Sequence, residues 1–364
     1  MIKIPWAKPF LGKEEKEFLL DALASTRISH GPYVEGFEKS FAKLQGQKFC
    51  VTTNSGTSAL YLALLAVGIK RTDEVIVPGF GFMAAANMVL AVGAKPLYAD
   101  INPDTWCMEP AEIFKKISKR TKAIVVVHPY GNVCDMPAIK QLARRHNLLL
   151  IEDVAQSPFS RYQGKLAGTF AEMGCFSFQA TKTIAMGEGG CVLTSNKKLN
   201  DKMRVIRNHG MTSDRRYWHE EIGQNFRLTN LQAALGVAQL KKLKEILEGK
   251  KRIHALYRKY LAYEEGVVFQ LFSPKVDAVV WAVAVRIDPK VFGVSRDTLI
   301  KRLLERGIET RPGFYPPSKM PFYKAPALPI AESIAENILV LPSFVQLTEQ
   351  QVKDVCNHIK KLKA

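Results

Sequence analysis

The sequence predicts an α/β fold, with a mainly parallel sheet of roughly seven strands between helices and a smaller C-terminal α/β domain. First, short β-type runs alternate with helix-like segments up to about residue 200. Second, the apolar run 148–151 passes directly into acidic residues, as buried strands of open α/β sheets do at their carboxyl ends. Third, strands and helices return at 260–364, after a long basic helix. We therefore expect a large domain at 1–240, and a linking helix with a small domain at 241–364.

The individual elements follow from β-type runs and helical periodicity. The expected strands of the large domain are Phe49–Thr53, Glu74–Val77, Lys95–Ala99, Ala123–Val127, Leu148–Ile151, Cys175–Phe178 and Cys191–Thr194. Its expected helices are Glu14–Ala24, Gly36–Gln45, Ser58–Val67, Ala138–His146 and Asn200–His209. A long helix Leu231–Lys259 then leads to strands Gly266–Leu271 and Val279–Ile287 and helices Ser295–Arg306 and Glu349–Lys361. No GxGxxG or GxxxxGK[ST] turn follows any strand, which disfavours the dinucleotide-binding and P-loop classes.

Composition limits the compartment and the partners. The apolar fraction of 47% and the charged fraction of 24% are typical of globular proteins. No apolar run reaches the roughly 20 residues of a membrane span, and the N-terminus has no apolar core before a cleavage site. The six cysteines form no CxxC pair or Cys/His ligand spacing. We therefore expect a cytoplasmic protein with reduced, buried thiols, no membrane span and no metal site.

The formal net charge of +18 raises the question of nucleic-acid binding. However, acidic residues are interleaved with the basic ones, and the densest basic run, 241–259, has an amphipathic period with leucines and isoleucines on one face. A solvated helix face explains this run better, so we expect no nucleic-acid partner. The positive field would also attract a nucleoside diphosphate sugar.

Lys182 is the first candidate for chemistry. It lies between two β-type runs, among small and apolar neighbours, and Gly187, Gly189 and Gly190 follow closely. Burial lowers the pKa of a lysine and leaves part of it as the free amine that attacks a carbonyl. The alternative is a loop lysine whose amine reaches solvent.

Two further stretches point to one cofactor. Asp153, at the carboxyl end of a buried strand, can hold the protonated nitrogen of a pyridine ring, while Lys182 forms an imine with the aldehyde of the same ring. The turn 54–59 precedes a helix and offers N–H groups, hydroxyls and the helix dipole to a phosphate. Alone, either stretch could be an ordinary helix N-cap. Together the three stretches predict a pyridoxal 5'-phosphate (PLP) site.

Five motifs occur in order along the chain: Asn54–Leu60, Glu152–Gln156, Ser177–Lys182, Gly187–Gly190 and Asn225–Thr229. This pattern resembles the DegT/DnrJ/EryC1/StrS family of PLP-dependent sugar-nucleotide aminotransferases, and the resemblance extends from residue 31 to residue 342. It implies the fold-type I PLP aminotransferase fold, and it implies a role for each residue that matches a family motif.

By this resemblance Lys182 is the catalytic residue. The implied cofactor-binding residues are Gly56, Thr57, Phe82, Asp153, Gln156, Ser177, Lys182 and Asn225, and the implied substrate-binding residues are His219, Arg311 and Tyr315. Phe82 would stack on the cofactor ring, although either Phe80 or Phe82 could instead fill the core. Asn225 would reach the phosphate of the partner subunit, giving a homodimer with shared active sites. His128 is a possible general base, but it matches a structural turn of the family, and His219 could equally be a surface histidine.

The implied reaction moves an amino group from L-glutamate to a keto sugar on a nucleotide carrier. The segments 217–219 and 309–312 favour an NDP-4-keto-6-deoxyhexose, as in perosamine- or viosamine-forming enzymes, for polysaccharide or glycoconjugate synthesis. Gly313 and Ser318 depart from the common family pattern and weaken this sugar preference. The alternatives are amination at C3, a non-catalytic regulator with the same fold, and a PLP lyase acting on small amino acids. Lys182 argues against the dehydratase branch, in which histidine replaces the lysine.

Overall fold

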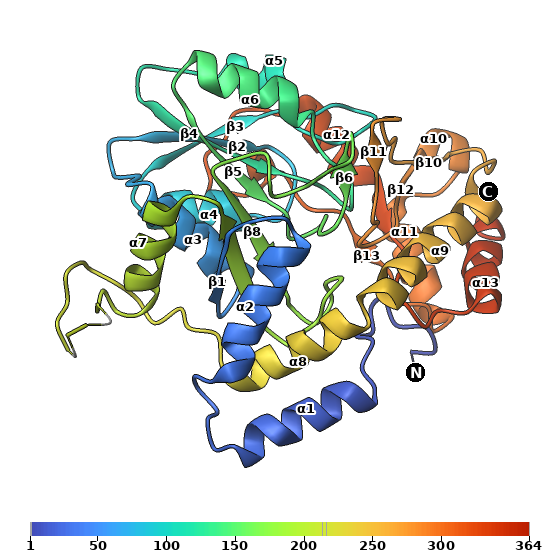
Figure 1. The fold of residues 1–364 in the computed structure, drawn as a ribbon. Coiled ribbons are helices and arrows are strands. Elements are labelled where there is room, and N and C mark those ends of the chain that lie inside the picture. The colour runs from blue at the N-terminus through green and yellow to red at the C-terminus, as the bar shows by residue number, and fades with distance from the viewer. Residues whose placement is uncertain (1, 213, 216, 364) are drawn as a thin grey trace.

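The computed structural model describes residues 2–212, 214–215 and 217–363, and it confirms the α/β fold (Figure 1). The large sheet has seven strands in the order β1-β9-β8-β5-β4-β2-β3. Their bounds are β1 Phe49–Thr53, β2 Glu74–Pro78, β3 Lys95–Ala99, β4 Thr121–Val127, β5 Leu149–Asp153, β8 Met173–Ser177 and β9 Gly190–Thr194. Only β9 is antiparallel to its neighbours, β1 and β8, so the sheet is mainly parallel as predicted.

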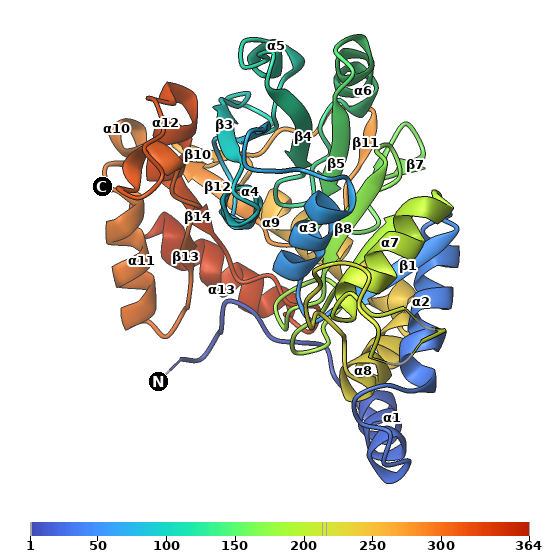
Figure 2. The ribbon, with the colours of Figure 1, turned by 90° about the vertical axis from the view of Figure 1, so that its left-hand side faces the viewer.

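Helices cover both faces of this sheet because successive strand residues point to opposite sides. In β1, for example, Val51 packs into one core cluster and Cys50 into the other. The helices of the first face are α3 (Gly56–Ala66), α4 (Ala84–Ala91) and α7 (Lys197–Arg207), and Figure 2 shows α3 and α7 side by side. Those of the second face are α2 (Pro32–Leu44), α5 (Pro110–Phe114), α6 (Met136–Arg145) and α8 (Asn230–Lys241). Helix α1 (Lys13–Ala24) packs on α8.

The C-terminal part has its own antiparallel sheet, in the order β10-β12-β14-β13. Its strands are β10 Val267–Phe269, β12 Ala284–Ile287, β13 Arg311–Pro312 and β14 Ile338–Val340. Helices α9 (Leu243–Leu261), α11 (Arg296–Glu305) and α13 (Glu349–Lys360) share a third core cluster with it. Residue Ile4 bridges to Ile308, so the N-terminal segment lies along this part before it reaches α1.

The remaining elements are short. They are the strands β6 (Arg161–Tyr162), β7 (Lys165–Leu166) and β11 (Val276–Asp277) of a third sheet, the helices α10 (Pro289–Phe292) and α12 (Pro329–Asn337), and a 3-10 turn, Pro317–Lys319. No helix within the described residues is both long and apolar enough to cross a membrane. All six cysteines are free and buried, as expected.

The predicted single helix Leu231–Lys259 is wrong, because the structure has two helices, α8 and α9, which meet at Lys242. Lys242 has φ −94° and ψ 10°, outside helical values. Helix α8 packs on α1 and α2, whereas α9 packs on α13. Helices α8 and α9 therefore pack against different hydrophobic cores, and the helical segment is interrupted where the first core ends. The domain boundary at residue 240 stays a prediction.

Candidate active site

A pocket of about 490 Å³ lies at the carboxyl ends of β5 and β8, beside the N-terminus of α3. Crevices outside the carboxyl ends of strands are where open α/β sheets bind ligands. The residues around it come from segments far apart in the sequence, among them Trp6, Ser55, Gly56, Thr57, Phe82, Asp153, Gln156, Ser177, Lys182, Trp281 and Phe314. The pocket thus brings together seven of the eight residues predicted to bind a cofactor.

Lys182 is half-buried on the loop between β8 and β9. Its Nζ lies 3.9 Å from the centre of the Trp281 ring. Burial of the amine lowers the pKa of Lys182 to about 8, an effect that the negative charge of Asp153 partly offsets. A sizeable fraction of free amine is therefore present near neutral pH, as the sequence predicts for a nucleophilic lysine.

Asp153 is the last residue of β5 and is 6% exposed. Burial raises the pKa of its carboxyl, while the backbone N–H of Ala155 and the charge of Lys182 oppose that rise. Ala155 N–H donates to Asp153 Oδ1 over 3.0 Å. A buried carboxylate of this kind is stabilised by a cation placed beside it, which is what a protonated pyridine nitrogen would supply.

The turn before α3 presents backbone N–H groups to the pocket. Ser55 is the N-cap of α3, and its Oγ accepts from Ser58 N–H over 3.1 Å. The N–H groups of the first helical residues, Gly56 and Thr57, have no partner within the helix, and they lie at the positive end of its dipole. An ordinary N-cap and an anion site therefore coexist here. Ser177, at the end of β8, lines the pocket beside this turn.

Close packing explains the glycine in this turn. A Cβ on Gly56 would lie 2.6 Å from Ser177 Cβ, well inside van der Waals contact. A Cβ on Gly190, at the start of β9, would lie 2.4 Å from the carbonyl oxygen of Ser55. Both positions therefore need glycine so that the turn can lie directly against β8 and β9.

The sequence left open whether Phe80 or Phe82 fills the core, and the structure places Phe80 there. Phe80 is 2% exposed and packs against Trp106 and Tyr130 in the core. Phe82 is 64% exposed and lines the pocket, with its ring 6.2 Å from that of Phe314. Phe82 is thus free to contact a flat ligand, and its stacking role stays a prediction.

Gln156 reaches the pocket from the segment that follows β5. It is 2% exposed, and its Oε1 accepts from Tyr130 N–H over 3.0 Å. This bond fixes the orientation of the amide, whose nitrogen is then available as a donor. Its predicted place beside the cofactor ring is consistent with this orientation.

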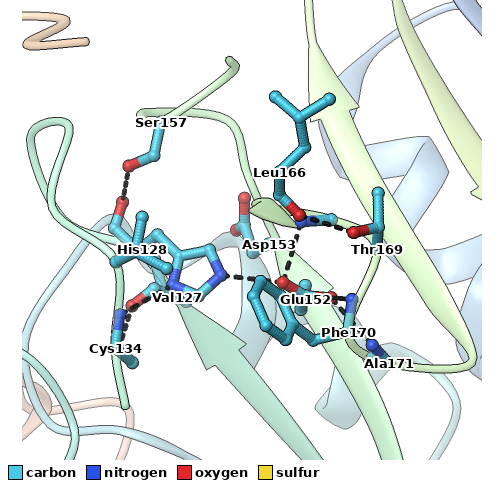
Figure 3. Close-up of polar contacts among 12 residues, drawn as sticks. Val127, His128, Cys134, Glu152, Asp153, Ser157, Leu166, Thr169, Phe170 and Ala171 are labelled. Carbon is cyan, nitrogen blue, oxygen red and sulfur yellow. Dashed lines mark hydrogen bonds and ion pairs between the residues drawn. The ribbon is translucent and has the colours of Figure 1, made fainter. Parts of the chain in front are cut away.

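His128 lies in a closed polar network next to the pocket (Figure 3). It is fully buried; its Nδ1 accepts from Cys134 N–H, and its Nε2 lies 3.1 Å from Glu152 Oε2. Glu152 also accepts from the N–H groups of Gly168, Phe170 and Ala171. Because strand neighbours point to opposite sides, Glu152 serves this network while Asp153 serves the pocket. Both ring nitrogens of His128 are occupied, which supports the structural role over general-base catalysis.

Four predicted residues do not line the pocket within the part of the chain that the structure describes: Asn225, His219, Arg311 and Tyr315. All four are exposed. Asn225 Oδ1 accepts from Arg227 Nε, and His219 Nδ1 lies 2.7 Å from the carbonyl oxygen of His209. Arg311 pairs with Glu309 and lies 5.7 Å from the ring of Trp6, which does line the pocket. The place of Asn225 at the site of a second subunit and the sugar-binding role of His219 therefore stay predictions.

Sequence reasoning missed the aromatic wall of the pocket. Trp6 and Trp281 meet edge-to-face with ring centres 6.0 Å apart, and Trp281 Nε1 donates to the carbonyl of Thr181 over 2.7 Å. Phe314 completes this wall. These residues reach Lys182 only through tertiary contacts between distant segments, and no local sequence pattern marks them.

Comparisons with known proteins match nearly the whole chain. The model of the DegT/DnrJ/EryC1/StrS aminotransferase family matches residues 9–360. The GDP-perosamine synthase of Escherichia coli O157:H7 is 40% identical over 361 residues, which are 98% of each chain. Among solved structures, DesV of S. venezuelae, in complex with a ketimine intermediate, has a TM-score of 0.90 at 34% identity over 98% of each chain. Spr1654 of Streptococcus pneumoniae, a putative sugar aminotransferase in its PMP form, has a TM-score of 0.92 at 25% identity, over 99% of this chain and 97% of that one.

The family match spans nearly the whole chain, and residues from four of its five motifs line one pocket. The chain therefore belongs to the DegT/DnrJ/EryC1/StrS aminotransferase family.

Proposed function

We propose that this aminotransferase uses PLP to move an amino group from L-glutamate to a nucleotide-linked 4-keto-6-deoxyhexose. The product would be a nucleotide-linked amino sugar for polysaccharide synthesis in the cytoplasm. One observation carries the proposal: Lys182 and Asp153, which come from different strand ends, line the same pocket as the N-terminus of α3. The volume of about 490 Å³ lies within the range of small-molecule sites.

The residues of the pocket fit PLP at three separate points. The amine of Lys182 suits the aldehyde, the buried carboxyl of Asp153 suits the ring nitrogen, and the N-terminus of α3 with Ser177 suits the phosphate. Bound there, PLP supplies an electron sink for the carbanion that forms when a proton leaves the substrate carbon. The PMP form of the Spr1654 relative supports a cofactor of this class.

The protein's own groups then divide the work. Lys182, with a pKa of about 8, can both take and return a proton near neutral pH, which suits a general acid and base. Asp153 favours a positive charge on the ring nitrogen. Trp6, Trp281 and Phe314 form an apolar wall that excludes water from one side of the pocket.

The nature of the sugar rests on similarity and on two sequence segments. The 40% identity to a GDP-perosamine synthase favours a nucleotide sugar as the amino acceptor. Segments 217–219 and 309–312 match the family form that favours a 4-keto sugar, and the exposed Arg311 beside Trp6 could contact an anionic carrier. The free, buried cysteines are consistent with a reducing compartment.

We also propose a homodimer with shared active sites. Asn225 is predicted to hold the cofactor phosphate, yet it lies outside the pocket of its own chain and is exposed. A partner subunit would reconcile these two observations, because the Asn225 of one chain could then complete the site of the other.

The test follows the two half-reactions. Protein loaded with PLP is mixed with L-glutamate alone, and 2-oxoglutarate release is measured together with the loss of the cofactor's aldehyde absorbance. A panel of 4-keto and 3-keto sugars on GDP, dTDP and UDP is then added to the aminated protein. We expect stoichiometric 2-oxoglutarate, followed by amination of a 4-keto sugar. Amination of a 3-keto sugar alone would place the reaction at C3. Release of other products from small amino acids would indicate a lyase, and no reaction at all would indicate a regulator.

A further inference from the structure

Lys250 is a buried lysine next to the pocket. It lies on α9 and is only 6% exposed, although lysine is rarely buried. Its Nζ donates to two backbone carbonyls, that of Trp281 over 2.8 Å and that of Ser343 over 2.7 Å. Both hydrogen-bond partners are neutral. The site therefore holds an amine without placing a carboxylate against it, unlike an ordinary buried ion pair.

The two carbonyls belong to the segments that carry the aromatic wall. Trp281 has its ring 3.9 Å from Lys182 Nζ, and its indole N–H donates to Thr181, the residue before Lys182. Ser343 donates its backbone N–H to the carbonyl of Trp6, whose ring packs edge-to-face on that of Trp281. Lys250 thus ties together the backbones that fix both tryptophans.

Lys250 and Lys182 also line one small cavity of about 20 Å³, which has room for about one water molecule. The other charged residue lining this cavity is Lys8, from the N-terminal segment. The pKa of Lys250 is lowered to about 7, mainly by burial and also by the positive charge of Lys182. Lys250 therefore loses its proton at a lower pH than Lys182, so it is largely neutral where Lys182 titrates and places little charge beside it.

We propose that Lys250 is a positioning residue for Lys182: by donating to the carbonyls of Trp281 and Ser343, it holds the Trp281 ring against the reactive lysine. The amine of Lys182 is thereby kept in place and shielded from water, which disfavours its charged form. The proposal rests on the assigned role of Lys182 as the reactive lysine. It concerns only residues of this chain, and it can be tested without cofactor or substrate.

Two variants separate the donors from the charge. Lys250→Met keeps the unbranched chain as far as the position of Cε but removes the terminal amine, and with it both the charge and the donors. Lys250→Gln removes the charge but keeps an NH₂ group that can donate to both carbonyls. The matched control is Lys251→Met, since Lys251 is the next residue of the same helix, has a half-exposed side chain and pairs with Asp277 at 2.8 Å.

The measurement is the rate at which a small amine-modifying reagent labels Lys182 in cofactor-free protein, followed by peptide mass spectrometry between pH 6 and 10. In the wild type we expect labelling to rise with a midpoint near pH 8. In Lys250→Met the midpoint should move to higher pH, with labelling at pH 7 reduced severalfold, because a loosened Trp281 wall admits water to the Lys182 amine and favours its charged form. In Lys250→Gln, which keeps a donor, the midpoint should move less. Lys251→Met should match the wild type.

Near-ultraviolet circular dichroism reports the tryptophan wall in the same samples. Lys250→Met should lose part of the tryptophan signal, and Lys250→Gln should retain more of it. A wild-type labelling profile in a folded Lys250→Met protein would overturn the proposal; if that variant does not fold, a wild-type labelling profile in Lys250→Leu, which also lacks the donors, would do so. Failure of the protein to take up PLP, with the labelling shift intact, would count against the proposed function only.

Discussion

The amine of Lys182 lies 3.9 Å from the centre of the Trp281 ring, so the loop after β8 directly contacts the segment that leads into β12. This contact closes one side of the pocket, and the indole N–H of Trp281 fixes the ring by donating to Thr181. The site also needs an acidic group, and Asp153, at the end of β5, lines the same pocket. The two parts of the chain therefore build the site together.

Asp153→Asn should separate catalysis from stability. The amide can still accept from Ala155 N–H, so the fold is retained, but the negative charge beside the ring nitrogen is lost. We expect kcat to fall on the order of 10²–10³-fold, as when one preorganised electrostatic group is removed. Steady-state kinetics with glutamate as donor checks this, and a wild-type kcat would contradict the role of Asp153.

The same variant has a pH signature. Burial raises the pKa of Asp153 in the folded protein, so the folded state binds a proton more readily than the unfolded state. The contribution of Asp153 to stability is therefore present at low pH and is lost as the pH rises through its folded-state pKa. Urea unfolding at a series of pH values should show this decline in the wild type and a weaker one in Asp153→Asn.

Gly56→Ala should disturb the phosphate turn, because the new Cβ would lie 2.6 Å from Ser177 Cβ. We expect a loss of about 1–3 kcal/mol in the free energy of unfolding, as in overpacked sites, and weaker binding of PLP. Gly36→Ala is the matched control: that glycine is inside α2, and a Cβ there meets no atom of the described residues within 4 Å. It should be neutral or stabilise by about 0.5–1 kcal/mol. Equal effects of the two changes on PLP binding would contradict the close approach.

The pair Phe80 and Phe82 offers a second matched comparison. Phe80→Ala empties a core position and should cost about 3–5 kcal/mol of unfolding free energy. Phe82→Ala removes a ring that is 64% exposed, so it should change stability little while weakening PLP binding. Fluorescence titration with PLP and chemical unfolding measure both. Unchanged PLP affinity in Phe82→Ala would show that this ring does not stack on the cofactor.

Shared active sites can be detected by mixing two inactive proteins. In a dimer of one Lys182→Ala subunit and one Asn225→Ala subunit, one site has both defects and the other has none. Random mixing after mild unfolding should restore about a quarter of the wild-type activity, since half of the dimers are mixed and each has one intact site. No recovery, with dimers confirmed by light scattering, would place Asn225 in the site of its own chain, and an active Asn225→Ala protein before mixing would place it outside any site.

Local patterns predicted much of the architecture. All seven strands of the large sheet were expected, because buried strands leave short apolar runs bounded by turns. The convergence of Lys182, Asp153 and the turn at Gly56 was predictable for a related reason: parallel strands present their ends at one edge of the sheet. Each of these inferences needs only residues that are neighbours in sequence.

The rest depended on packing between distant segments. Trp6 and Trp281 reach Lys182 only because the N-terminal segment lies along the C-terminal sheet. The amphipathic pattern of 241–259 predicts a solvated basic face, yet Lys250 within it is buried against Trp281. No glycine or proline lies at the helix break at Lys242, so the local sequence does not mark it. Tertiary contacts decide all of these features.

The central claim is that one amine, that of Lys182, receives the cofactor. The most direct measurement is to mix the purified protein with PLP, reduce it with borohydride, and map the modified peptide by mass spectrometry. We predict a single pyridoxyl group on Lys182, and neither the modification nor turnover in Lys182→Ala. Modification of a different lysine in the wild type, or full turnover by Lys182→Ala, would contradict the account.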